Sequence, residues 1–220
     1  MSLEFLAEKL ALLFPLVLSL SLHELAHART ALAFGDPTAR NMGRCTLNPL
    51  AHLDPVGTLA LLFCGFGWAK PVPVNPHNLH PSKWGNIAVS FAGPFSNLIL
   101  GILVGLVLRL MWILDVPFDS PLGAALWAIG SFTMAANLCL FVFNMVPLYP
   151  LDGHHIFREQ LPADMQTGFM QWQLRYGRLV LMGLIFAPFL VQTMGIEGID
   201  PLSLLFGHVQ DLAFDVLVVP

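Results

Sequence analysis

The segment that most constrains the fold begins at Leu10 and carries no charged residue before Glu24. Inside this segment, residues 23–27 read His-Glu-Leu-Ala-His. On a helix, positions four apart are separated by about 40° of rotation and roughly 6 Å of rise, so both imidazoles can reach one metal ion. Glu24 falls beside them, where a carboxylate can take a proton from water activated by zinc. The pattern therefore predicts a hydrolytic zinc site inside a membrane helix.

Composition sets the class of protein. Hydrophobic residues make up 56% of the 220 residues and charged residues only 11%, and the mean hydropathy is +0.70. The apolar residues come in long blocks, which indicates a polytopic membrane protein that contacts the lipid bilayer directly. The length leaves no room for an additional soluble domain of ordinary size, so we expect one membrane domain over residues 1–220. The 10 Lys and Arg residues are scattered, and nothing supports nucleic-acid binding.

The apolar blocks predict an all-α bundle of about five or six transmembrane helices. Four blocks are long enough to span, at about residues 5–34, 86–114, 122–146 and 177–195. A further block at 202–219, the possible sixth when residues 55–67 are counted as well, contains His208, Gln210, Asp211 and Asp215. It either spans while facing the protein interior or lies in the interface as an amphipathic helix. No cleavable signal peptide is expected, because Glu4 and Glu8 stand where a basic region would be.

Two connecting segments are expected to stay near one membrane surface. Residues 55–67 are apolar but too short to cross about 30 Å of hydrocarbon as a helix, and we interpret them as re-entrant. Residues 35–54 contain Gly, Pro and Asn breakers around short polar pieces, and we expect a small surface β element there, a strand or hairpin.

Charge asymmetry predicts the orientation. Eight of the 10 basic residues lie between the end of the first helix and Lys83 or between Arg158 and Arg178, whereas the 115–121 connection holds only acidic charges. By the positive-inside rule the two basic regions face the cytoplasm. The first helix then runs from outside to inside. The chain is expected to be an integral, multi-pass protein of the cell (inner) membrane, with its site toward the cytoplasmic side.

A catalytic zinc ion needs a third protein ligand at the same depth as the two histidines. The predicted helix at about residues 122–146 descends from outside and ends in Asn144-Met-Val-Pro147-Leu-Tyr-Pro150-Leu-Asp152-Gly153, where two prolines break the helix and a carboxylate follows. Asp152 is therefore the predicted third ligand. The alternative is an ordinary helix-ending turn, because Pro, Asp and Gly are turn residues in any case.

These motifs together resemble the site-2 proteases, which are intramembrane zinc metalloproteases. His23-Glu24-x-x-His27 is followed by Gly93-Pro94-x-x-Asn97 and then by Asn144-x-x-Pro147-x-x-x-x-Asp152-Gly153. The resemblance is to compact prokaryotic members without a PDZ or CBS domain. It implies that His23, His27 and Asp152 bind zinc and that Glu24 activates water. It also implies that Asn144 lies beside the site and steadies the substrate or an intermediate.

The expected reaction is hydrolysis of peptide bonds in single-pass transmembrane substrates near the cytoplasmic face, as in regulated intramembrane proteolysis. A substrate helix must unwind first, because its carbonyls are bonded within the helix, and an extended strand could then pair with the 36–54 region. A metal transporter would show polar residues through several helices or an inverted repeat, and neither is found. A zinc-binding pseudoenzyme is disfavoured because Glu24 is present. The substrate and the oligomeric state are not predicted.

Other polar residues receive weaker interpretations. Asn97 is either a contact to a ligand or substrate, or a bystander of a close helix crossing at Gly93 and Pro94. His154 and His155 are expected at the surface or behind the ligands, because three ligands and water already complete a catalytic zinc site. The remaining loop histidines, which are expected to be solvated, are His52, His77 and His80.

Overall fold

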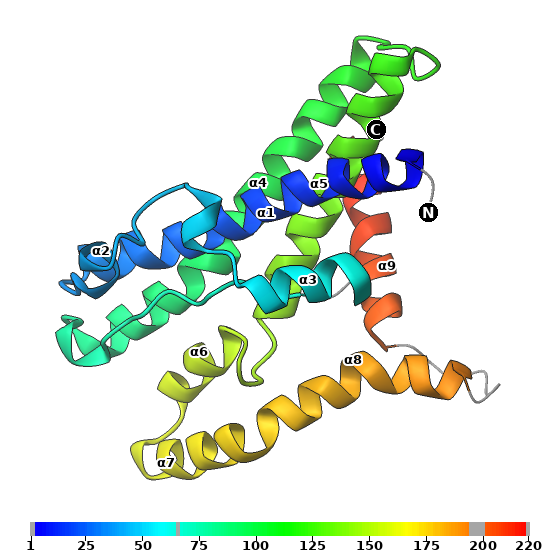
Figure 1. The fold of residues 1–220 in the computed structure, drawn as a ribbon. Coiled ribbons are helices and arrows are strands. Elements are labelled where there is room, and N and C mark those ends of the chain that lie inside the picture. The colour runs from blue at the N-terminus through cyan, green and yellow to red at the C-terminus, as the bar shows by residue number, and fades with distance from the viewer. Residues whose placement is uncertain (1–2, 65–66, 194–200, 219–220) are drawn as a thin grey trace.

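The computed structural model describes residues 3–64, 67–193 and 201–218, and the described residues are almost all helical or in the turns between helices. Three long helices, α1, α4 and α5, form the centre of the molecule (Figure 1). Their bounds are Leu3–Ala33, Ser82–Ile113 and Pro121–Asn144. The shorter helices are α2 (Thr38–Asn41), α3 (Pro55–Cys64), α6 (Gly153–Gln160), α7 (Ala163–Trp172), α8 (Arg178–Thr193) and α9 (Pro201–Ala213).

Helix α4 packs against both α1 and α5, and small residues let the helices approach closely. A Cβ at Gly101 of α4 would lie 2.9 Å from the Leu138 side chain of α5, and one at Gly130 of α5 would lie 2.7 Å from the Leu108 side chain of α4. Such contacts between small residues and larger ones drive helix association in lipid, where burial alone gives no advantage. The largest buried cluster joins α4, α5 and the C-terminal residues through Leu108, Trp127, Met134, Leu138, Ala213 and Val218.

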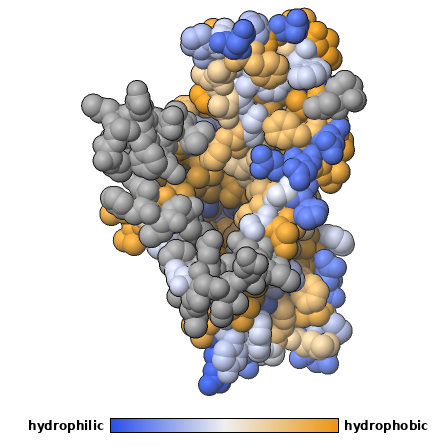
Figure 2. Space-filling model, turned by 90° about the vertical axis from the view of Figure 1, so that its right-hand side faces the viewer, coloured by the Kyte–Doolittle hydropathy of each residue, from blue (hydrophilic) through white to orange (hydrophobic). Residues whose placement is uncertain are grey.

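The long helices fall on the apolar blocks of the sequence. Among the described residues, α4 and α5 are long and apolar enough to cross a bilayer. The outer face of α4 exposes large aliphatic side chains, including Leu103, Leu106 and Val107. On the face drawn in Figure 2, apolar side chains cover much of the middle of the molecule, and hydrophilic ones lie at its top and bottom and along its right-hand side. A surface of this kind fits a membrane protein, because lipid covers what water would not.

The expected strand or hairpin over residues 35–54 is not found in that stretch, which instead forms α2 and the 3₁₀ turn η1 (Pro49–Ala51). Hydrogen bonds between side chains and nearby backbone groups explain the difference. Asp36 accepts a hydrogen bond from the backbone N–H of Thr38, and Asn48 accepts one from that of Leu50. Such Asx turns compete with strand pairing. Within the described residues, β pairing is limited to one isolated bridge between Leu53 and Ala69.

Segment 55–67, expected to be re-entrant, begins with α3, which has only 10 residues and is too short to cross a bilayer. Near the other end of the chain, α7 continues through a π-helical turn, η3 (Gln173–Gly177), into α8. Helix α9 and the π turn η4 (Phe214–Val218) pack against α5 and α4. Figure 1 shows α8 crossing the molecule at the end opposite the α4–α5 connection, with α9 returning alongside α5.

Candidate metal centre

The site contains two histidines that lie one turn apart on α1. His23 and His27 are buried, with exposed fractions of 6% and 8%. Their Nε2 atoms lie 3.0 Å apart, and the two rings meet edge to face. The i, i+4 spacing therefore brings both imidazoles to one point, as the sequence pattern requires.

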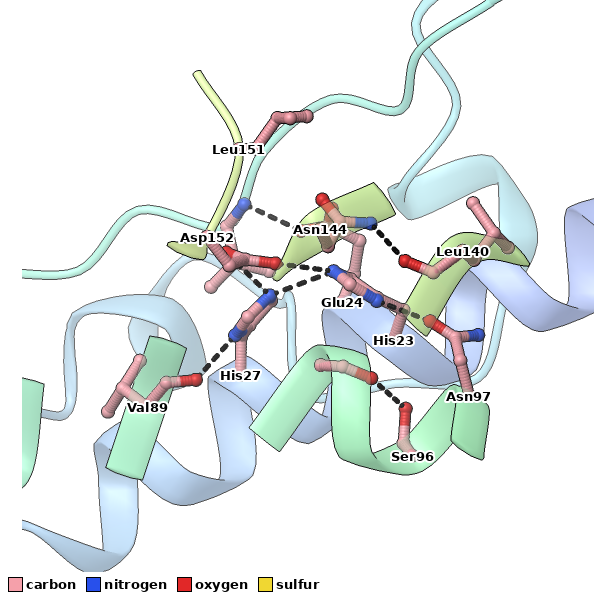
Figure 3. A network of polar contacts seen from close by, with 12 residues as sticks. His23, Glu24, His27, Val89, Ser96, Asn97, Leu140, Asn144, Leu151 and Asp152 are labelled. Carbon is pink, nitrogen blue, oxygen red and sulfur yellow. Dashed lines mark hydrogen bonds and ion pairs between the residues drawn. The ribbon is translucent and has the colours of Figure 1, made fainter. Parts of the chain in front are cut away.

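Asp152 reaches the same point from the far end of α5. Its Oδ2 lies 3.1 Å from His23 Nε2, and its Oδ1 lies 3.3 Å from His27 Nε2. One ligand atom from each of the three residues lies within 4.8 Å of the others. Figure 3 shows the carboxylate facing both rings. Residues 129 positions apart in the chain thus form one cluster.

A braced turn delivers Asp152 to this position. After α5 ends, the chain passes through Pro147 and Tyr149 to Asp152, which directly precedes α6. The side chain of Gln173, only 1% exposed, accepts a hydrogen bond from the Tyr149 N–H at 2.7 Å and donates one to the Pro147 carbonyl at 2.8 Å. At Gly153 a Cβ would lie 2.4 Å from the Met145 carbonyl oxygen, so glycine is required there.

Helix α4 closes the other side of the site. At Gly93 a Cβ would lie 2.3 Å from His27 Nε2 and 2.6 Å from His23 Nε2, so α4 can approach the two rings only with glycine at this position. One turn on either side of Gly93, the Val89 carbonyl lies 2.6 Å from His27 Nδ1, and Asn97 Oδ1 lies 2.6 Å from His23 Nδ1. Of the two interpretations of this segment, the close crossing and the contact to a ligand both apply.

The donor chemistry of this cluster fits zinc. A carbonyl oxygen only accepts, so Val89 requires His27 to carry its proton on Nδ1 and to present the Nε2 lone pair to the cluster. A carboxylate also only accepts. Lone pairs that converge in a buried pocket need a cation between them, and two imidazoles with one carboxylate are the ligand set of a catalytic zinc site with an open position.

Glu24 lies beside this cluster and is 8% exposed. Its Oε2 accepts a hydrogen bond of 2.8 Å from the backbone N–H of Val72. The non-helical segment that contains Val72 is held by the buried guanidinium of Arg44, which donates to the carbonyls of Lys70 and Pro71. Neither Val72 nor Arg44 was expected from the sequence, because their contacts arise only from the packing of distant segments.

Asn144 is the last residue of α5, and Figure 3 shows it next to Glu24 and Asp152. Its side-chain N–H₂ donates to the Leu140 carbonyl one turn earlier at 3.0 Å. The residue is therefore beside the cluster, as expected, with its amide turned by a bond within its own helix.

The other histidines discussed above differ in burial. His155, expected at the surface or behind the ligands, is half-buried. His77 and His80 are exposed, as expected of loop residues. The expectation for His52 was wrong, because this side chain is 1% exposed; its Nε2 bonds the Thr46 carbonyl at 2.8 Å. His154 is also buried, and its Nδ1 contacts the Leu151 carbonyl behind Asp152.

A buried pair of histidines with a carboxylate, and a glutamate next to them in an apolar helix bundle, defines a membrane metallohydrolase. The family model "Peptidase family M50" matches residues 11–126. The "Putative zinc metalloprotease YwhC" of Bacillus subtilis (strain 168) is 41% identical over 177 residues, which cover 80% of each chain. The chain therefore belongs to peptidase family M50, the site-2 proteases, and is an intramembrane zinc metalloprotease.

More distant relatives agree with this assignment. Two mycobacterial proteins with the same description, both named Rip2, are 29% identical (Mycolicibacterium smegmatis, strain ATCC 700084 / mc(2)155) and 32% identical (Mycobacterium tuberculosis, strain ATCC 25618 / H37Rv). The matched parts cover 78% of this chain and 65% of each of these relatives, so the Rip2 proteins extend beyond the matched region. No solved structure matches the chain.

Proposed function

We propose that this metalloprotease cleaves single-pass transmembrane proteins inside the bilayer, near its cytoplasmic face, as a step of regulated intramembrane proteolysis. In this proposal His23, His27 and Asp152 bind one zinc ion, and Glu24 is the general base. The observation that carries the proposal is the contact of Asp152 with both histidines. The turn after α5 places a carboxylate against two imidazoles, and a zinc ion between these three side chains accounts for that arrangement.

Each residue has a separate task in the reaction. Bound zinc lowers the pKa of a water molecule and polarises a substrate carbonyl. Glu24 accepts the proton of the attacking water and returns it to the leaving amine. The Val72 N–H bonds Oε2 of Glu24 and so fixes the plane of the carboxylate, which leaves Oε1 for the proton. Asn144, next to Glu24 and Asp152, steadies the substrate (Figure 3).

The substrate must present an extended segment, because the carbonyls of a helix are already bonded. Residues 36–54, where pairing was expected, form α2 and η1 and offer no strand within that stretch. We place the substrate instead along residues 69–75, a non-helical stretch in which Ala69 bridges Leu53 and Val72 contacts Glu24. This non-helical stretch lies next to the general base, where the bond to be cut in an unwound substrate must also lie.

The orientation rests on charge. Basic residues gather in the connections at the end of the bundle where α1 ends and α6 and α7 begin, and acidic ones occupy the α4–α5 connection. The positive-inside rule then places the multi-pass chain with the His23 end of α1 toward the cytoplasm.

The experiment uses the purified full chain in proteoliposomes with a single-span test protein, and mass spectrometry locates the cut. We expect wild-type protein and Asp164→Asn, a change at an exposed carboxylate, to cut within the membrane segment near its cytoplasmic end, and Glu24→Gln to leave the test protein intact. Cleavage by Glu24→Gln at the wild-type rate, or a cut outside the membrane segment, would contradict the proposal. Comparison of membrane proteomes from cells with wild-type and Glu24→Gln protein would then identify natural substrates.

A further inference from the structure

A chain of buried hydrogen bonds leads from His23 into the helix bundle. His23 Nδ1 contacts Asn97 Oδ1 at 2.6 Å (Figure 3), and Asn97 Nδ2 donates to Asn137 Oδ1 at 2.8 Å. Asn137 Nδ2 in turn donates to the Thr133 carbonyl and to Ser19 Oγ, each at 2.8 Å. The chain crosses all three central helices, since Ser19 and His23 lie on α1, Asn97 on α4 and Asn137 on α5.

The two asparagines are fully buried, with exposed fractions of 0%. Burying a carboxamide costs free energy unless its donors and acceptors are all paired, and aliphatic residues would fill the same space without that cost. A role in helix packing alone therefore does not explain two adjacent amides that end on a histidine of the metal centre.

The bonds of Asn137 fix which groups donate and which accept along this chain of hydrogen bonds. The Thr133 carbonyl only accepts, so the amide of Asn137 must turn its N–H₂ toward it and its oxygen toward Asn97. Ser19 agrees, because its hydroxyl donates to the Pro15 carbonyl at 2.7 Å and can only accept from Asn137. Two separate backbone carbonyls thus impose the same orientation on Asn137.

The orientation of Asn137 determines that of Asn97, and through it the tautomer of His23. Asn97 meets the oxygen of Asn137 and must donate to it, which turns the Asn97 oxygen toward His23. His23 must then donate from Nδ1, so that its Nε2 carries a lone pair. The Val89 carbonyl imposes the same tautomer on His27 directly, because it accepts a hydrogen bond from Nδ1.

We infer that Asn137 and Asn97 are positioning residues, which hold His23 in the Nδ1–H tautomer with its Nε2 lone pair aimed at the metal position. Asn137 acts through Asn97, as one layer further from the site. The inference rests on the proposed function, because it takes His23 as a zinc ligand. Partners of this kind fix the ring and raise the basicity of a ligating histidine.

The test measures zinc affinity of the purified full chain in detergent by competition with a chelator. Asn97→Ala and Asn137→Leu, which removes the amide without leaving a cavity, are each expected to weaken zinc binding by roughly 10- to 100-fold. The double variant should bind no more weakly than Asn97→Ala, because Asn137 acts through Asn97. Thr133→Ala is the matched control on α5. It removes the hydroxyl but keeps the carbonyl that Asn137 uses, so its affinity should equal that of the wild type.

The outcomes separate two failures. If His23→Ala binds zinc as tightly as the wild type, the proposed ligand set is wrong. If His23→Ala loses zinc while the Asn97 and Asn137 variants keep wild-type affinity, the positioning role of the two asparagines is wrong but the ligand set stands. The same holds if the effects of Asn97→Ala and Asn137→Leu on zinc affinity add in the double variant. Should the variants fail to fold, ¹⁵N resonances of the His23 ring in the wild-type zinc protein decide. A proton on Nδ1 and the metal on Nε2 support the positioning role of the two asparagines, and the metal on Nδ1 overturns it.

Discussion

The backbone N–H of Val72 donates a hydrogen bond of 2.8 Å to the carboxylate of Glu24, across 48 residues of sequence. This bond links the segment that follows α3 to the proposed general base. Because the Arg44 guanidinium binds the two preceding carbonyls, the position of this N–H is set by the fold and does not depend on the Val72 side chain.

Removing that N–H should impair catalysis without affecting the metal. We expect Val72→Pro to lower kcat by roughly 10- to 100-fold, a part of what a positioned general base contributes. Zinc content should stay at the wild-type level, because Val72 contacts the base and not the cluster. Val72→Ala keeps the N–H and is expected to cleave at close to the wild-type rate. Equal rates for the Pro and Ala variants would show that the bond has no catalytic role.

Gly93 should tolerate no side chain, because its Cβ would overlap both Nε2 atoms. We expect Gly93→Ala to weaken zinc binding by about tenfold or more, the range seen when ligand orientation is disturbed. Gly183→Ala on α8 is the matched control: nothing lies within 4 Å of its Cβ position, and it should keep wild-type affinity. Zinc titration of the two variants makes the comparison, and equal affinities would contradict the close crossing.

Gln173 should influence the metal centre through the turn that it braces. Gln173→Leu leaves the Tyr149 N–H and the Pro147 carbonyl, both in partly buried bonds, without their partner, at a cost of about 1 kcal/mol for each bond. We expect lower stability in detergent together with weaker zinc binding, because Asp152 follows in the same turn. Gln171→Leu, at an exposed position of α7, should change neither quantity. A Gln173→Leu protein that unfolds more easily but binds zinc normally would limit Gln173 to a role in stability.

Asp36 should make stability depend on pH in the acid range. Burial opposes its ionisation, but hydrogen bonds from Thr38, Asn78 and Asn75 outweigh burial and lower the pKa of its carboxyl group. A lowered folded-state pKa stabilises the protein above the ordinary carboxyl pKa of about 4, and this stability is lost as the pH falls through the folded-state value. The free energy of unfolding, measured from pH 7 down to pH 3, should therefore fall less steeply for Asp36→Asn than for the wild type. An unchanged slope, matching that of Asp164→Asn, would contradict this role.

The residues of the candidate metal site could be predicted from the sequence because their signals are local or follow from topology. His23, Glu24 and His27 occupy one helical turn, and Asp152 is the carboxylate that the charge pattern brings back to the same depth. The long helices were likewise visible as apolar blocks. Spacing could not reveal Val72, Gln173 or Asn137, since each acts through a contact between segments that only tertiary packing brings together.

The surface connection shows where sequence patterns fail. Gly, Pro and Asn breakers in residues 35–54 indicate turns, but they do not distinguish a hairpin from short helical turns. The side chains of Asp36 and Asn48 favour the short helical turns, because each accepts a hydrogen bond from the backbone N–H two residues further on. His52 was expected in solvent for a similar reason: nothing in the sequence places Arg44 and Thr46 around it.

The central claim is that His23, His27 and Asp152 bind zinc while Glu24 does not, and zinc content of the purified full chain tests it most directly. Elemental analysis should find about one zinc ion per chain in the wild type and in Glu24→Gln, and little in His23→Ala, His27→Ala or Asp152→Ala. An Asp152→Ala protein that retains wild-type zinc, or a Glu24→Gln protein that loses it, would contradict the account.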